Sequence, residues 1–180
     1  MDICSRYGGR GPGAGCSGDA PKAGQGWSAT AAELDLTWKP STNKTQGTLT
    51  GKWQGFDVVV EGQHVGTFQE RREQTCFRLT LKKKPGVSVI SGDYDDGIET
   101  GDKEFDRQFL VEAPREAAAL RVLEKNTRRK MLAFVNSHGA LKLEDAQLSA
   151  NVEGKLPDAE ALKEVLDGLS TIARLMARHS

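Results

Sequence analysis

The strongest hydrophobic pattern lies at the C-terminal end of the chain. From Pro157 onward, apolar side chains recur every three or four residues, the spacing of one face of an α-helix. Asp158 and Glu160 stand in the first turn and Arg174 and Arg178 in the last, so the charges complement the helix dipole. The sequence therefore predicts a long helix from Pro157 to the end, whose apolar face includes Leu162, Leu169, Ile172 and Met176.

In the first half of the chain, apolar and polar residues alternate with a period of two, which is typical of strands with one buried face. From Gln74 to Lys84, Phe77 and neighbouring leucines point one way, whereas Cys76 and Arg78 point the other way. This leaves Cys76 on the wet face, where we expect modest thiol accessibility. Further strands are predicted at residues 36–38, 47–53, 56–61, 87–90 and 105–111, with a tight hairpin turn at Gln54-Gly55 and another turn at 62–66.

The remaining elements are shorter. A helix is predicted at residues 28–34, and a helix pair follows Pro114 with a break near Asn126, a candidate N-cap, and a stop at Gly139. A second hairpin is predicted at 141–152, about a turn at 144–146.

The first 26 residues are rich in glycine and nearly free of large apolar side chains. Such a segment cannot bury enough apolar surface to offset its ordering entropy, so we predict a disordered tail at 1–26 and a single domain at 27–180. The predicted fold class is α+β: an antiparallel β-sheet of about five to seven strands packed by two main helices.

Charge and composition narrow the function classes. Lys plus Arg and Asp plus Glu number 25 each, so a dedicated nucleic-acid binder is disfavoured. No apolar run approaches the length that spans a bilayer, and the N-terminus lacks a signal peptide's apolar region, so we expect a cytoplasmic protein. Cys4, Cys16 and Cys76 have no CxxC spacing, which predicts free thiols; a Cys4–Cys16 disulfide under oxidising conditions is the alternative.

An acidic segment at residues 93–106 contains seven carboxylates against one lysine. Hard cations such as Ca²⁺ prefer several oxygen ligands, so Asp93, Asp95, Glu99 and Glu104 are candidate metal ligands. However, Gly97 stands where a calcium loop of the EF-hand type has an acid or amide, and Ile98 stands where that loop has its glycine. A solvated connection is the favoured interpretation.

A basic run precedes the acidic segment. Residues 71–84 contain six positive charges against one acid, Glu73. The run either pairs weakly with the acidic segment or faces a partner such as an anionic membrane or nucleic acid; the near cancellation of the two runs favours a solvated face.

No sequence motif indicates catalysis. His64, His138 and His179 are isolated, and there is no P-loop, GxGxxG after a strand, HExxH or GxSxG. We therefore expect a protein that is not an enzyme and needs no cofactor.

From Leu34 onward, the order of motifs resembles a bacterial domain family of unknown function with myxobacterial members. The resemblance rests on residues 32–38 and 49–58, on Thr100-Gly-Asp-Lys-Glu-Phe-Asp106 leading into Phe109-Leu-Val111, and on the helix pair at 123–132. It implies no catalytic residues, and it implies that the Thr100–Asp106 segment is a turn-plus-strand motif in which Gly101 supplies an unusual backbone angle. The glycine-rich head departs from the family pattern.

These observations lead to one functional expectation with two alternatives. We expect a non-enzymatic protein-interaction or adaptor module of a bacterial cytoplasmic protein that binds a protein partner or self-associates. The apolar face of the last helix, or exposed strands, would form the contact, with Leu162, Leu169, Ile172 and Met176 as candidate partner-binding residues. A secretion-chaperone-like binding protein and a Ca²⁺-binding domain are the alternatives.

Overall fold

The fold is built on one antiparallel sheet of eight strands. A computed structural model describes residues 25–40, 47–66, 72–94, 96–154 and 158–178. The strands are β1 (Thr37–Pro40), β2 (Gly47–Trp53), β3 (Phe56–Val65), β4 (Arg72–Thr80), β5 (Ser88–Ser91), β6 (Phe109–Glu112), β7 (Ala140–Glu144) and β8 (Gln147–Glu153). Their spatial order is β1-β2-β3-β4-β8-β7-β5-β6, and every neighbouring pair is antiparallel.

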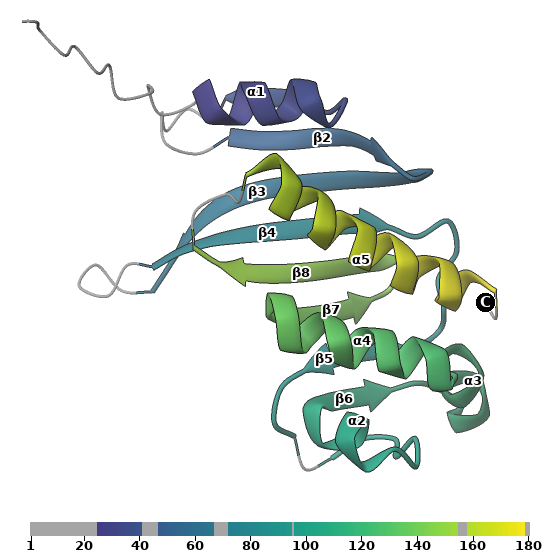
Figure 1. The fold of residues 1–180 in the computed structure, drawn as a ribbon. Helices are drawn as coiled ribbons and strands as arrows, with labels where there is room; N and C mark the ends of the chain where they lie inside the picture. Colours follow the sequence, from purple (N-terminus) through teal and green to yellow (C-terminus); the bar gives the residue numbers. More distant parts are fainter. Residues whose placement is uncertain (1–24, 41–46, 67–71, 95, 155–157, 179–180) are drawn as a thin grey trace, which may run out of the picture.

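Five helices complete the described part of the chain. They are α1 (Gln25–Glu33), α2 (Lys103–Gln108), α3 (Glu116–Val122), α4 (Lys125–His138) and α5 (Ala159–Ala177). The two long helices, α4 and α5, lie side by side across one face of the sheet (Figure 1). The α+β class and the antiparallel sheet are confirmed; the sheet has one strand more than the predicted range of five to seven, and three shorter helices accompany α4 and α5 in the described part of the chain.

Alternation along the strands places the hydrophobic core between the sheet and the helices. On β3 and β4, Val58, Val60, Phe77 and Leu79 are at most 1% exposed. The opposite face carries mostly polar and charged side chains, of which Arg78 and Glu61 form a cross-strand ion pair. Cys76 also lies on that face, but it is only 9% exposed, so the expected accessibility of its thiol was wrong. Burial raises the pKa of this thiol above its ordinary value, which keeps it protonated at neutral pH.

Two hairpin turns follow from their sequences. Gln54 and Gly55 both have positive φ, 49° and 89°, as the two central residues of a tight hairpin turn require. The pairing of Trp53 with Phe56 across them confirms the predicted register. The β7–β8 hairpin turns at Asp145 and Ala146, also as predicted.

Three local predictions were wrong. β3 runs on to Val65, so residues 62–65 continue the strand instead of turning. The helix pair breaks at Leu123 and Glu124, so Asn126 lies inside α4 and is not its N-cap. Of the strand predicted at 105–111, residues 109–111 do lie in a strand, β6, but residues 105–108 belong to helix α2, because Asp102 caps a helical turn there. The predicted tail lies almost entirely outside the described residues, although α1 already begins at Gln25.

Helix α5 packs so closely on α4 that one position admits only glycine. A Cβ atom at Gly168 would lie 2.9 Å from Cδ2 of Phe134 on α4. The Phe134 ring is 4% exposed and also contacts His138, with the ring centroids 5.0 Å apart, so it has little room to move. The α4–α5 contact therefore depends on the missing side chain at Gly168.

We predict that Gly168→Ala lowers the free energy of unfolding by about 1–3 kcal/mol, because the overlap with Phe134 outweighs the better helix propensity of alanine. The matched control is Gly26→Ala in α1, where a Cβ atom meets nothing within 4 Å and where we expect a neutral or slightly stabilising effect. Urea unfolding followed by circular dichroism measures both. Equal effects of the two substitutions would contradict the packing account.

Candidate functional site: a basic cleft at the end of helix α5

The residues proposed from the sequence for partner binding lie in the core. Leu162, Leu169 and Met176 are 0% exposed and Ile172 is 1% exposed. Their spacing identified the buried face of α5 correctly, but that face packs on the sheet and on α4. These four side chains are therefore covered in this structure, and a partner surface has to be sought elsewhere.

The candidate metal ligands do not converge. Asp95 lies outside the described residues; Asp93 and Glu99 lie in the connection between β5 and α2, and Glu104 is an exposed residue of α2. Within the described ranges, no group of three or more His, Cys, Asp or Glu side chains is placed to hold a metal ion. The calcium alternative gains no support there.

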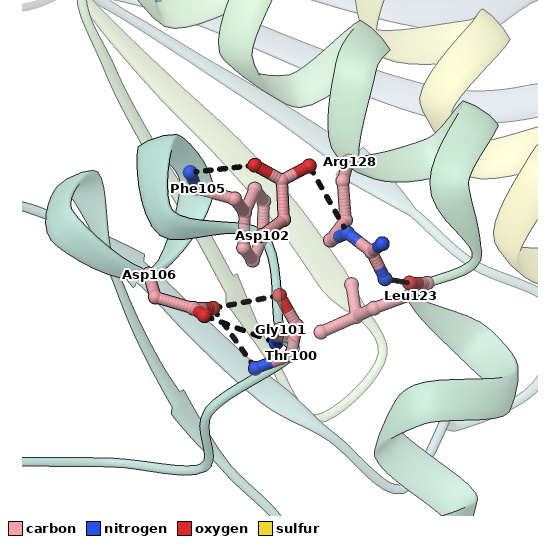
Figure 2. A network of polar contacts seen from close by, with 7 residues as sticks. All are labelled: Thr100, Gly101, Asp102, Phe105, Asp106, Leu123 and Arg128. Atoms are coloured by element: carbon pink, nitrogen blue, oxygen red, sulfur yellow. Dashed lines mark hydrogen bonds and ion pairs between the residues drawn. The ribbon is translucent and has the colours of Figure 1, made fainter.

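The end of the acidic segment has a structural role instead (Figure 2). Asp106 accepts hydrogen bonds from Thr100 N at 2.9 Å, from Thr100 Oγ1 at 2.6 Å and from Gly101 N at 3.1 Å. Gly101 has φ 79°, the unusual backbone angle expected of it. The carboxylate of Asp106 thus closes the turn that leads into α2, and little of its charge remains for a ligand.

Asp102 links the same turn to α4. One carboxylate oxygen accepts from Phe105 N at 3.4 Å and caps α2, while the other lies 3.6 Å from Nε of Arg128. Arg128 also donates to the carbonyl oxygen of Leu123 at 2.7 Å, where α3 ends (Figure 2). The Phe105 and Phe109 rings stack beneath this network with centroids 4.4 Å apart. The Thr100–Asp106 motif is therefore a helix-capping joint between α2, α3 and α4.

We predict that Asp106→Ala lowers the free energy of unfolding by about 1–3 kcal/mol, because three donors lose their charged acceptor. Glu104→Ala on the same helix removes an exposed carboxylate and is expected to change stability by less than about 0.5 kcal/mol. Thermal or urea unfolding of both variants is the measurement. A Glu104 effect as large as that of Asp106 would contradict the assigned role.

The basic run at 71–84 does not act as a unit. Arg72 lies 4.0 Å from Glu153, Arg78 pairs with Glu61, and Lys84 lies 2.9 Å from Asp145. These partners come from β8, β3 and the β7–β8 turn, not from the acidic segment, and Arg71 lies outside the described residues. Lys82 and Lys83 remain exposed and form no ion pair within the described part of the chain.

Lys82 and Lys83 line a cleft of about 520 Å³, which we call the basic cleft. Three parts of the chain form it because the β2–β3 turn and the end of β4 lie at the same end of the sheet, and α5 ends there. Leu81 is fixed in place by its N–H, which donates to the carbonyl oxygen of Ala146 at 2.7 Å. The lining residues are Gln54, Gly55, Phe56, Leu81, Lys82, Lys83, Arg174, Ala177 and Arg178.

The lining is basic at the rim and apolar at the base. Four of its side chains are cationic and none is acidic, while Phe56 and Leu81 are each 7% exposed. Arg174 lies in the last turn of α5 and Arg178 is its C-cap residue, four positions later and therefore on the same side of the helix. The arrangement can hold an anionic group close to an apolar one.

A hydrogen-bonded chain holds one wall of the cleft. Asp167 of α5 accepts from Trp53 Nε1 at 2.9 Å and from Gln54 Nε2, and Gln54 Oε1 accepts from Arg174. The Asp167 carboxylate is thus occupied by two donors from the β2–β3 hairpin. The guanidinium of Arg174 is held toward the hairpin turn by an uncharged acceptor, so its positive charge is not neutralised by that contact.

Some residues of this cleft are conspicuous in the sequence. Lys82 and Lys83 stood out in the basic run, but Arg174 and Arg178 were interpreted only as complements of the helix dipole. The two lysines and the two arginines lie close together only because of where α5 crosses the sheet, and no local sequence pattern predicts that position.

Comparisons with known proteins bear on the fold. No family model and no curated protein matches this sequence, so the resemblance to a bacterial domain family stays a prediction. The chain is similar to a solved structure, that of the mycobacterial trehalose monomycolate transport factor A, TtfA, with 12% sequence identity and a TM-score of 0.56. The match covers 87% of this chain and 96% of that chain, so the two share the arrangement of elements across nearly their full lengths.

Proposed function

We propose that this chain is a non-enzymatic protein-interaction module of a bacterial cytoplasmic protein, and that its basic cleft binds an acidic segment of a protein partner. The observation that carries the proposal is the cleft's composition: four cations surround an apolar base with no carboxylate among the lining residues. Charge complementarity selects an acidic partner, and the apolar base favours a segment that also carries a bulky apolar side chain.

The carboxylates nearest the cleft support the same conclusion. Asp167 is bound by Trp53 and Gln54, Asp57 lies 4.0 Å from Lys52, and Asp145 lies 2.9 Å from Lys84. None of the four cations that line the cleft forms an ion pair with another described residue, and Arg174 is joined to Asp167 through the Gln54 amide.

Other anionic partners fit the cleft less well. A single-stranded nucleic acid would need exposed aromatic rings for stacking, but Phe56 is buried and the net charge of the chain is zero. A membrane surface would need protruding apolar side chains, and among the described residues the exposed large hydrophobic ones are Val65 and Tyr94, neither of which lines the cleft. No described helix is long and apolar enough to cross a bilayer.

The chaperone-like alternative needs an exposed apolar patch of several hundred Å². Exposure of Val65 and Tyr94, which lie on different elements, does not supply such a patch within the described part of the chain.

We predict that the full chain binds a fluorescein-labelled probe peptide of alternating glutamate and leucine or phenylalanine. Fluorescence anisotropy at low salt is the measurement, and Lys82→Glu/Lys83→Glu is expected to weaken binding at least tenfold through like-charge repulsion. A matched peptide with glutamine in place of glutamate tests the charge requirement, and one with serine in place of the apolar residues tests the apolar base.

The control variant is Arg129→Glu/Lys130→Glu, which makes the same change of charge at exposed positions of α4 that do not line the cleft. It is expected to bind the probe peptide within about twofold of the unmodified chain, because surface charges outside the contact act mainly through a screened field. The proposed site would be refuted if both variants weakened peptide binding equally, or if the glutamine peptide bound as tightly as the glutamate peptide.

A further inference from the structure

We infer that the acidic segment received by the basic cleft belongs to a second copy of this chain, namely its own connection between β5 and α2. This inference rests on the proposed function and specifies the partner. We call residues 92–101, without Asp95, the acidic loop.

The acidic loop carries exposed carboxylates and an exposed aromatic side chain, the two kinds of group that the cations and the apolar base of the cleft can bind. Asp93, Asp96 and Glu99 are exposed, and none of them forms an ion pair with another described residue. Between them Tyr94 is 42% exposed, one of two large hydrophobic residues in the described ranges that are exposed. Its ring lies over Gly92, where a Cβ atom would come within 2.5 Å of Cε2 of Tyr94. The loop thus presents an aromatic ring among free carboxylates.

The carboxylates of the Thr100–Asp106 motif take no part. Asp102 and Asp106 are bound within the capping joint, as described above. Their hydrogen bonds fix the C-terminal side of the acidic loop, and the pairing of Ile98 N with the carbonyl oxygen of Val111 at 2.8 Å fixes its middle. The loop is therefore anchored on the sheet, which reduces the entropy it would lose on binding.

One molecule cannot bring its own loop into its own cleft. The cleft lies at the ends of β3 and β4, whereas the loop follows β5, and β8 and β7 separate these strands in the sheet. Figure 1 shows α2 and β6 at one end of the sheet, away from the C-terminal end of α5. The contact therefore has to join two molecules.

Such a contact is head-to-tail, because the loop and the cleft are different surfaces. Each molecule that binds through its cleft still has a free loop, so association does not stop at a dimer unless a ring closes. The zero net charge of the chain favours this assembly, since no general repulsion opposes the approach of copies.

The inference is tested by sedimentation velocity of the full chain, measured at low salt over a range of protein concentrations. We expect mass to increase with concentration beyond a dimer, and we expect 1 M NaCl to return the chain to monomer because exposed charges are screened. Lys82→Glu/Lys83→Glu blocks the cleft, and Asp93→Ser/Asp96→Ser removes charges from the loop; each alone is expected to reduce the association constant at least tenfold.

Sedimentation velocity of an equimolar mixture of the two variants is the most informative measurement. The first retains an intact loop and the second an intact cleft, so an equimolar mixture contains one working interface and is expected to form a 1:1 dimer that does not grow. The controls Arg129→Glu/Lys130→Glu and Glu33→Lys/Glu73→Lys alter exposed charges elsewhere and are expected to associate like the unmodified chain.

The outcomes separate this inference from the proposed function. A chain that stays monomeric at every concentration, yet binds the glutamate probe peptide through Lys82 and Lys83, overturns the self-association and keeps the acidic-segment site. A chain that neither associates nor binds the peptide overturns both. Association that survives 1 M NaCl or both variants also overturns the inference, because it would use another surface.

Discussion

The packing of α5 against both the sheet and its neighbour α4 determines where the basic cleft forms. Nine of its side chains are buried, and at Gly168 the absence of a side chain lets the Phe134 ring of α4 approach. The preceding residue, Asp167, accepts hydrogen bonds from Trp53 and Gln54 of the β2–β3 hairpin. Because the helix is held at both points, its last turn comes to lie beside Lys82 and Lys83, and four cations meet around an apolar base.

In both the acidic segment and the basic run, some charged side chains are paired within the molecule and others are not. Two of the seven carboxylates of the acidic segment, Asp102 and Asp106, belong to the capping joint, where they bind backbone donors and Arg128. Asp93, Asp96 and Glu99 stay exposed in the acidic loop. Similarly, Arg72, Arg78 and Lys84 of the basic run have acidic partners, while Lys82 and Lys83 do not. The charges left over on each side are the ones that a partner could use.

Local patterns were sufficient for elements whose period or turn chemistry is strong. The α5 stripe, the Gln54-Gly55 turn and the glycine at the end of α4 were all read correctly from the sequence. Residues 105–111 were predicted as one strand because Phe105 and Phe109 looked like sheet residues. Phe109 does lie in strand β6, whereas the Asp102 cap places Phe105 in helix α2, where the two rings stack. The basic cleft could not be predicted, because its residues come from three segments brought together by sheet topology. The apolar pattern of α5 also led to the prediction that this face binds a partner, because apolar periodicity does not distinguish a face buried in the core from one that binds another protein.

The basic cleft at the end of α5, and not the polar face of the sheet, is the proposed binding surface. The most direct measurement is a titration of the isotope-labelled full chain with the glutamate probe peptide, followed by amide chemical shifts. The account predicts that the largest shifts fall on Gly55, Lys82, Lys83 and the last turn of α5. Shifts centred instead on Cys76, Ser149 and Lys142, which lie on the polar face, would contradict it.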